Sequence, residues 1–253
     1  QIAWEAQRDL THTVALVITI NLFLLFAVRV IKAPAAWNYI ALGLFAGLGM
    51  LSKYNFALIP IAVFVAVAAH PQWRQRLIDR RILLAAITGF LVTFPHALWL
   101  IDNLAIASGR TLGIMAQDAP DTAFGQFIQG PIRFIRITLI ILAPLFGVYL
   151  LVFRGEGLRS LKQSTDWTRF FDRIFLTLVI VIFVLIVAIG MTALRDRWLM
   201  PFIALVPIWL CLKLEAEGVR SQSFASHFLA IPLIVMLVVP VVLLARTNLP
   251  GLF

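Results

Sequence analysis

Four residues early in the chain interrupt an otherwise apolar stretch. Ser52, Lys53, Tyr54 and Asn55 stand within the apolar run 42–69. An ionisable group in such a place is costly unless it is paired or hydrated, so Lys53 is a candidate functional residue. Its charge could neutralise a phosphate, and Tyr54 and Asn55 could donate hydrogen bonds to that phosphate or to a sugar. The alternative is that Lys53 extends to lipid headgroups and marks a helix end.

A second group of charges directly precedes Trp198. Arg195 and Arg197 flank Asp196. Two guanidinium groups can bind a phosphate in bidentate fashion while the carboxylate holds one of them. Pro201 suits the first turn of a following helix. The alternative is a short external turn with arginine anchors and an interfacial tryptophan.

A third candidate cluster lies in the segment Trp4 to His12. If this segment is helical, Glu5, Arg8, Asp9 and His12 share one face. Such a face could orient a sugar, ligate a metal or form a lattice of salt bridges. A metal site is poorly supported because His12 has no second His or Cys nearby, so we predict no metal ligands, and the use of a divalent metal stays open. The salt-bridge lattice is the simpler interpretation.

The remaining histidines are interpreted as structural. We expect His70 in a solvated loop, His96 packed or hydrogen-bonded inside a helical bundle, and His227 at an interface. The sequence has no phosphate-binding glycine loop and no G-x-S-x-G segment. Nucleotide hydrolysis and serine esterase chemistry are therefore unsupported.

The elements that must position these residues follow from the composition. Apolar residues make up 62% of the 253 residues and charged residues 13%, and the mean hydropathy is +0.97. A soluble domain needs more polar surface. We therefore predict an all-α fold, a polytopic bundle of transmembrane helices. The net charge of +9 fits basic loops and anionic headgroups, so no nucleic-acid partner is expected.

Apolar runs separated by charged residues predict about eight membrane segments. Two of them, 39–51 and 56–69, are short and form either a hairpin of short helices or one broken helix. The predicted segments are Thr13–Val30, Tyr39–Leu51, Phe56–Ala69, Ile82–Ile101, Phe134–Phe153, Ile174–Leu194, Trp198–Leu212 and Phe228–Leu244.

The basic residues indicate the orientation. If the first span runs inward, thirteen of the 21 Lys and Arg residues fall on the inner side, as the positive-inside rule favours. Segments 154–173 and 213–227 are then cytoplasmic loops, 102–133 is an outer-face loop, and all three charged clusters lie outside. We expect a single transmembrane domain over 1–253. Because the chain opens with neither an initiator Met nor a signal peptide, we also expect an N-terminally truncated protein with sequence upstream of Gln1.

The three clusters occur in an order that resembles a known family. Residues 43–54, GLFAGLGMLSKY, resemble the G-x-x-x-G-x-x-x-L-[ST]-K-[YGW] segment of the membrane glycosyltransferases of family 39, the protein mannosyltransferase and aminoarabinose transferase superfamily. Residues 197–201, RWLMP, are similar to its R-Y-L-L-P segment, with Trp in place of Tyr. Residues 4–12 resemble a segment that leads into a middle helix of bacterial members. Each motif is short, and the weight lies in their order and spacing.

The resemblance implies a GT-C fold and a sugar donor carried on a polyprenyl phosphate. It implies Lys53, Arg195 and Arg197 as the cations that bind the lipid phosphate and stabilise its charge as the glycosyl bond breaks. The catalytic base of the family, usually an Asp of the first external loop, would lie upstream of Gln1, so the catalytic residue is unknown here. The candidate sugar or acceptor contacts are Glu5, Arg8, His12, Tyr54 and Asn55.

We therefore predict a glycosyltransferase of the bacterial inner membrane with its active face periplasmic or extracellular. Its partners would be a polyprenyl-phosphate-linked sugar, membrane lipids and an envelope acceptor such as lipid A, core oligosaccharide, polysaccharide or protein. The alternative is a polytopic transporter or lipid flippase, which would also use broken helices and intramembrane charge. The clustering of charges at one face and the lack of an inverted repeat count against it. A non-catalytic scaffold subunit is a third hypothesis, and no residue selects the sugar.

Overall fold

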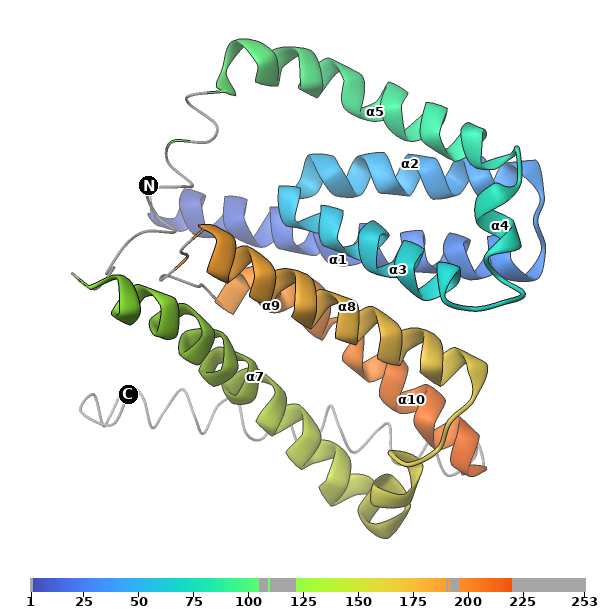
Figure 1. Ribbon diagram of the computed structural model, residues 1–253, viewed down its shortest axis with the longest axis vertical. Coiled ribbons are helices and arrows are strands. Elements are labelled where there is room, and N and C mark those ends of the chain that lie inside the picture. The colour runs from blue at the N-terminus through green and yellow to red at the C-terminus, as the bar shows by residue number, and fades with distance from the viewer. Residues whose placement is uncertain (1, 105–108, 110–121, 190, 192–195, 220–253) are drawn as a thin grey trace. The chain divides into compact units, whose positions relative to one another are not determined.

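The computed structural model shows a chain built from helices (Figure 1). Every regular element in the described ranges is helical, so the predicted all-α class is confirmed. The described residues are 2–104, 109, 122–189, 191 and 196–219. Within these ranges only the backbone is described at 2–13, 123–124, 126–127, 189, 196–197 and 200–201.

Four helices of the described residues are long and apolar enough to cross a membrane. They are α1 (Ile2–Lys32), α5 (Ile82–Asp102), α7 (Ala123–Ser160) and α8 (Asp166–Ile189). Two shorter apolar stretches correspond to the short predicted pair: α2 (Ala36–Ser52), and the 3₁₀ helix η1 (Tyr54–Ala57) with α3 (Leu58–Ala68). The short helix α4 (Gln75–Ile78) precedes α5. The predicted segment 228–244 lies outside the described residues.

One predicted segment, 198–212, is not continuous. It is divided into α9 (Asp196–Ile203) and α10 (Val206–Glu217). Pro207 explains the division, because proline has no N–H to donate to the carbonyl of Ile203 and its ring collides with that carbonyl in a continuous helix. Pro201 lies inside α9 and not in its first turn, so that prediction was wrong.

Helix α7 also departs from the predicted boundaries. It begins at Ala123, inside the segment predicted as an outer-face loop. The predicted end of this span at Phe153 agrees with the structure, because the backbone of Arg154 is non-helical with φ 45° and ψ −125°. The residues after this break form a short helical extension. The hydroxyl groups of Tyr149 and Ser160 hydrogen-bond at 2.5 Å and connect the extension to the span.

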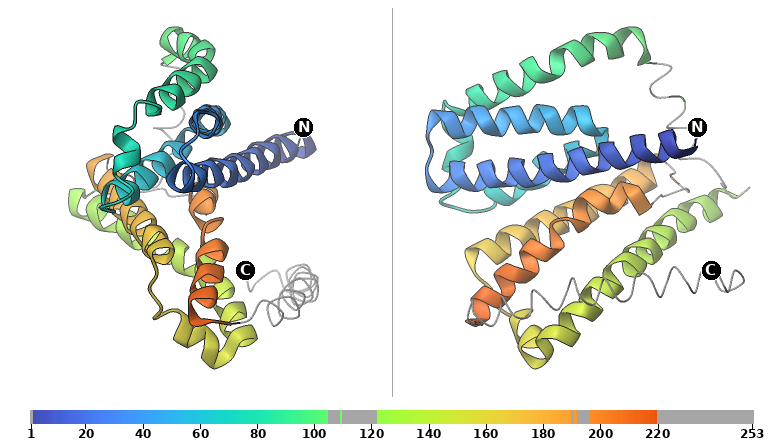
Figure 2. Two further views of the ribbon diagram at one scale, coloured as in Figure 1. Left: turned by 90° about the vertical axis from the view of Figure 1, so that its right-hand side faces the viewer. Right: turned by 180° about the vertical axis from the view of Figure 1, so that it is seen from behind.

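The chain forms two compact units, which are described separately. Unit 1 comprises residues 1–139 and 169–206, and unit 2 comprises 140–168 and 207–253. In unit 1, α1 and α2 lie side by side and antiparallel, joined by a short turn (Figure 2). The largest fully buried side chains of unit 1 are Leu16, Ile20, Tyr39, Phe56, Ile59, Phe170, Ile174 and Leu205.

Glycines allow α2 and α5 to approach closely. A Cβ atom on Gly43 would collide with the backbone of Ala85, and one on Gly47 would lie 2.7 Å from Cβ of Val92. Small residues spaced in this way let helix backbones pack together in a membrane. Because Gly43 meets Ala85 and Gly47 meets Val92, the two helices run parallel. Their C-terminal ends therefore lie at one end of unit 1, which we call the Lys53 end.

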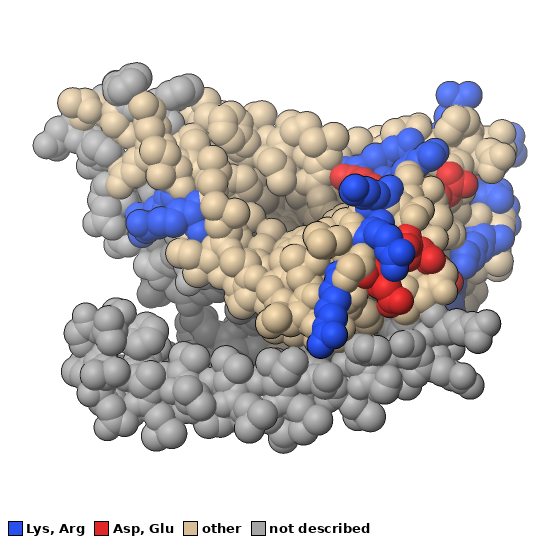
Figure 3. Space-filling view, turned by 90° about the horizontal axis from the view of Figure 1, so that it is seen from below, with Lys and Arg blue, Asp and Glu red and all other residues tan. Residues whose placement is uncertain are grey.

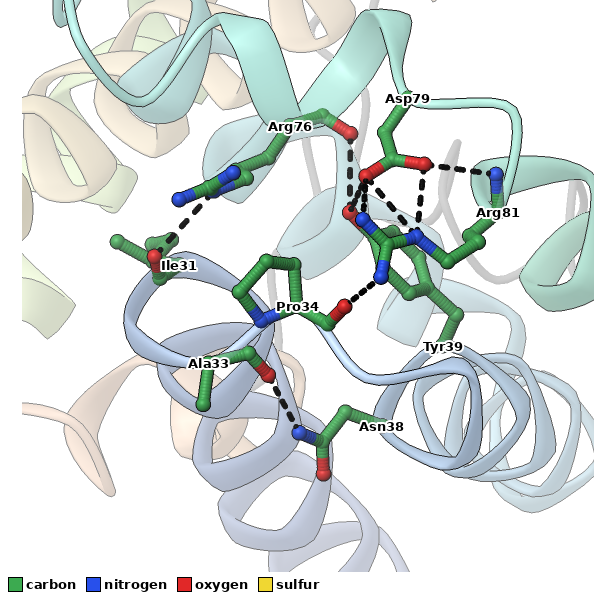
Figure 4. A network of polar contacts seen from close by, with 8 residues as sticks. All are labelled: Ile31, Ala33, Pro34, Asn38, Tyr39, Arg76, Asp79 and Arg81. Carbon is green, nitrogen blue, oxygen red and sulfur yellow. Dashed lines mark hydrogen bonds and ion pairs between the residues drawn. The ribbon is translucent and has the colours of Figure 1, made fainter.

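The opposite end of unit 1 carries a polar network between two turns (Figure 4). Asp79 receives hydrogen bonds from Arg81, at 2.6 Å from Nη2, and from the Tyr39 hydroxyl at 3.3 Å. Arg81 also donates to the carbonyl of Pro34, and Arg76 donates to that of Ile31. The side-chain hydrogen bonds from Arg81, followed by its backbone N–H, lower the pKa of Asp79 to about 2. This Arg81 end ties the turn after α1 to the turn before α5.

The outward surface of α5 is apolar. None of its side chains is buried, and Phe90 and Leu91 are 59% and 63% exposed. Exposed apolar surface of this kind is expected where lipid, and not water, surrounds the protein. In the space-filling view, a broad area of the described surface carries no charged side chain (Figure 3).

Unit 2 holds a buried cation near the end of α10. Lys213 is 5% exposed, donates to the carbonyl of Gln163 at 2.7 Å and lies 5.4 Å from the centre of the Trp209 ring. The amide of Gln163 donates to Glu217 at 2.5 Å, and Arg159 lies 3.5 Å from the same carboxylate. These contacts connect the loop 161–165 to α10.

Candidate functional site

The break after α2 is held in place by Phe56. This side chain is fully buried, and its ring meets Phe23 of α1 edge-on, with 5.7 Å between the centroids. Gly49 leaves the necessary room, because a Cβ atom there would collide with the Phe56 ring. Lys53 ends α2 in an extended conformation, with φ −158° and ψ 140°, while its N–H donates to the carbonyl of Gly49 at 3.2 Å. The local sequence thus fixes Lys53 at a defined helix break, where it is partly exposed.

A hydrogen bond connects this break to the R-W-L-M-P segment. Nδ2 of Asn55 donates to the backbone carbonyl of Trp198 at 3.1 Å. The neighbouring Leu199 is buried, and α9, which contains both residues, packs against α1. Two motifs that are far apart in sequence are therefore adjacent in unit 1. Oδ1 of Asn55 is buried and has no hydrogen-bond partner among the described residues.

Three aromatic rings follow the break at the Lys53 end. The Tyr54 hydroxyl lies 2.8 Å from Nε2 of His96, and their rings are stacked with centroids 5.8 Å apart. The His96 ring is stacked on Trp99, with centroids 5.6 Å apart. The expectation that His96 forms a hydrogen bond agrees with this contact, but the contact is exposed and α5 buries no side chain, so His96 is not buried inside the bundle. The role of Trp99 was missed, although its spacing of three residues from His96 places both on one helix face.

Some of the predicted site residues are described with their side chains, some only by their backbone, and Arg195 is not described. Lys53, Tyr54 and Asn55 are described with their side chains. The segment 4–12 is helical, which is the condition under which Glu5, Arg8 and His12 would share one face. It lies at the start of α1, whose antiparallel course beside α2 brings it to the Lys53 end. Arg197 lies in the first turn of α9 with only its backbone described. The side chains of Glu5, Arg8 and His12, and the whole of Arg195, lie outside the described residues.

Metal ligation has little support in the described part of the chain. No group of three or more His, Cys, Asp or Glu side chains is placed there to hold a metal ion. What the described site does offer is an ammonium group at a helix break, an amide, a phenol and an imidazole. These groups can bind a phosphate and hydrogen-bond a polar ligand such as a sugar.

The fold and this site define a helical membrane protein with a polar site at one end of its bundle. Residues 1–99 match the model of the family described as dolichyl-phosphate-mannose-protein mannosyltransferase. The matched part contains the first and third charged clusters, His96 and Trp99. The predicted resemblance to these membrane glycosyltransferases is therefore confirmed.

Curated proteins of Rhizobium johnstonii are similar to most of the chain. The lipopolysaccharide core galacturonosyltransferase RgtB is 36% identical over 245 residues, which is 96% of this chain and 49% of RgtB. The lipopolysaccharide core galacturonosyltransferase RgtA is 34% identical over 228 residues, 90% of this chain and 46% of RgtA. The chain thus spans about half the length of the curated relatives it matches. No solved structure matches it.

Proposed function

We propose that this chain forms part of a GT-C membrane glycosyltransferase that transfers a sugar from a polyprenyl phosphate to an acceptor of the bacterial envelope. The relatives favour galacturonic acid as the sugar and the lipopolysaccharide core as the acceptor. Transfer would take place on the periplasmic face of the inner membrane. The observation that carries the proposal is the hydrogen bond from Asn55 to Trp198, because it joins the lysine-bearing break to the arginine-bearing segment.

The reaction breaks the bond between the anomeric carbon of the sugar and the phosphate oxygen. The bonding electrons stay on the phosphate, and the acceptor hydroxyl forms the new glycosidic bond while its proton passes to a base. Lys53, Arg195 and Arg197 would bind the phosphate and stabilise the charge that develops on it. No carboxylate of this chain is assigned as the base.

The proposed role of the break also fits its position along the bundle. Charged residues inside membrane segments are costly and usually mark a substrate path. A donor that is itself a membrane lipid presents its phosphate close to the bilayer surface, so a cation at a helix break can meet it without a nucleotide-binding domain. Glu5, Arg8, His12, Tyr54 and Asn55 would contact the sugar or the acceptor.

The test uses the full-length protein in membranes and a labelled polyprenyl-phosphate sugar. Lys53→Ala and Arg197→Ala are each expected to lower transfer by about 100-fold, as removal of a group that stabilises developing charge typically does. Lys53→Arg keeps a cation and should retain part of the activity. Arg80→Ala alters an exposed arginine before α5 and serves as the control.

Two outcomes of this test would contradict the proposal. Wild-type transfer by both alanine variants would overturn the site assignment. Absence of transfer by the full-length wild-type protein, with the sugar lipid accumulating in sealed vesicles, would overturn the proposed activity and favour a transporter or flippase.

A further inference from the structure

The three rings of Tyr54, His96 and Trp99 form a short stack at the Lys53 end of unit 1. The planes of Tyr54 and His96 are 29° apart, and those of His96 and Trp99 are 19° apart. Tyr54 comes from η1, whereas the other two residues come from α5, so the stack connects the helix break to the parallel helix. Tyr54 is 51% exposed and Trp99 is 48% exposed. Much of their ring surface is thus available to a ligand.

The stack differs from an interfacial belt of aromatic residues. Belt Trp and Tyr side chains lie at the headgroup level, where their amphipathic rings meet the membrane–water interface. Here the rings face one another, and an imidazole lies between the phenol and the indole. The Tyr54 hydroxyl also hydrogen-bonds the imidazole and fixes its orientation. Such an ordered set combines apolar ring faces with polar atoms, as sites for small polar ligands do.

The imidazole supplies a hydrogen-bond donor for an anion. When the Tyr54 hydroxyl donates to Nε2 of His96, the imidazole carries its proton on Nδ1. That N–H can donate to a carboxylate. A neutral sugar offers only hydroxyl groups at the same position, and a hydrogen bond to a hydroxyl group is weaker than one to an ionised acceptor.

The distance along the chain links this stack to the phosphate site. Tyr54 directly follows Lys53, the residue proposed to bind the donor phosphate. In a polyprenyl-phosphate sugar the anomeric carbon is bonded to a phosphate oxygen, so the sugar ring must lie next to the phosphate. Next to Lys53, the aromatic stack is the described feature that offers both ring faces and a hydrogen-bond donor to the sugar.

We propose that Tyr54, His96 and Trp99 form the subsite for the transferred sugar, and that His96 selects a hexuronic acid by binding its carboxylate. The ring of Trp99 would contact the C–H face of the sugar. Tyr54 would hold the imidazole in position. This inference rests on the proposed function, and it adds a residue that determines which sugar is transferred.

The experiment compares two donors with the full-length enzyme. One is polyprenyl phosphate carrying galacturonic acid, and the other carries galactose, which lacks the carboxylate. His96→Phe keeps a stacked ring and removes the N–H. This substitution should lower kcat/KM for the galacturonic acid donor by about tenfold or more, because a hydrogen bond to a charged group contributes about that much. The value of kcat/KM for the galactose donor should change far less. His96→Gln retains an N–H donor and should restore part of the preference.

The tryptophan variants test the stacking surface. Trp99→Ala should lower kcat/KM for both donors, whereas Trp99→Phe should retain most of the activity. The control is Trp37→Ala, because Trp37 is 66% exposed and lies at the other end of α2. If an interfacial role explained Trp99, both alanine variants would behave alike.

The outcomes separate this inference from the proposed function. If His96→Phe lowers kcat/KM equally for both donors, or for neither, the selective role of His96 is overturned. The proposed transferase activity is not affected by that result. If the wild-type enzyme transfers from neither donor, the proposed function itself fails. If wild-type transfer from the galactose donor is too slow to measure, the galactose donor is tested as an inhibitor of transfer from the galacturonic acid donor. Its inhibition constant then replaces kcat/KM, and His96→Phe should change that constant far less than it changes kcat/KM for the galacturonic acid donor.

Discussion

The side-chain amide of Asn55 donates a hydrogen bond to the backbone carbonyl of Trp198, at 3.1 Å and across 143 positions of the sequence. This contact places the helix break next to a segment that is distant in the sequence. The backbone carbonyl accepts the bond, so the identity of the residue at 198 matters less than its position. The donor, in contrast, must be an N–H at position 55.

Asn55→Asp is expected to weaken both stability and transfer. The substitution keeps the size of the side chain but replaces the donor with an oxygen that repels the Trp198 carbonyl. Loss of the hydrogen bond should lower the stability by about 1 kcal/mol, and more if the new carboxylate stays buried. The measurements are thermal unfolding in detergent and sugar transfer in membranes.

Asn38→Asp provides the matched control for that substitution. Asn38 also donates from Nδ2 to a backbone carbonyl, that of Ala33, at 2.7 Å. It is partly exposed and lies at the start of α2, away from the proposed site. Its substitution should leave transfer per folded molecule unchanged. Equal loss of transfer in both variants would contradict a specific role for the Asn55 contact.

Gly47→Ala is expected to disturb the packing of α2 against α5. The new Cβ would lie 2.7 Å from Cβ of Val92, so the helices must separate or Val92 must move. Overpacking of this kind typically lowers stability by about 1–3 kcal/mol. Gly147→Ala in α7 is the control, because no atom lies within 4 Å of the added Cβ. The melting temperature should fall for the first variant and stay level or rise for the second.

Asp79→Asn tests the network at the Arg81 end. The pKa of Asp79 is lowered from 3.8 to about 2, chiefly by its hydrogen bonds from the Arg81 side chain. A lowered pKa means that the folded state favours the carboxylate, so the stabilisation is complete above pH 3.8 and is lost as the pH falls through about 2. The melting temperature of the wild-type protein should therefore exceed that of the variant near neutral pH. The difference should shrink between pH 4 and pH 2, and a difference independent of pH would contradict the assignment.

Lys213→Met removes the buried cation of unit 2. The Gln163 carbonyl loses its donor and the Trp209 ring loses its cation, while the methionine still fills most of the space. We expect a loss of about 1–2 kcal/mol in the stability measured by thermal unfolding. Lys162→Met changes an exposed lysine in the same unit and should have little effect. Equal effects would show that the buried contacts of Lys213 contribute nothing.

Local patterns were sufficient to predict much of the fold. The apolar runs predicted the long helices because a membrane requires long apolar stretches, and the polar residues 52–55 predicted the break. The division between α9 and α10 was missed because the composition of 198–212 is uniformly apolar, although Pro207 carried the signal. The start of α7 was missed because glycine and glutamine dilute the apolar pattern near residue 125.

The candidate site depended more strongly on tertiary structure. Sequence order suggested that Lys53 and the Arg197 segment belong together, but the contact that joins them uses Asn55 and a backbone carbonyl, which no motif displays. The stack of Tyr54, His96 and Trp99 arises from the parallel register of α2 and α5. That register depends on the fit of Gly43 and Gly47 against α5 and could not be deduced from spacing alone.

The parallel course of α2 and α5 also determines how deep Lys53 lies relative to the C-terminal end of α5. His96 lies level with Tyr54, and α5 continues from His96 to Asp102, which at 1.5 Å per residue adds about 9 Å along the helix axis. Lys53 therefore lies below the C-terminal end of α5 by about 9 Å, which is more than the roughly 5–8 Å of one headgroup layer. A lipid whose phosphate reaches this lysine must sink, or the bilayer must thin around α2, and the short helix favours such local thinning. The protein would thus draw its substrate down from the membrane surface before any bond is broken.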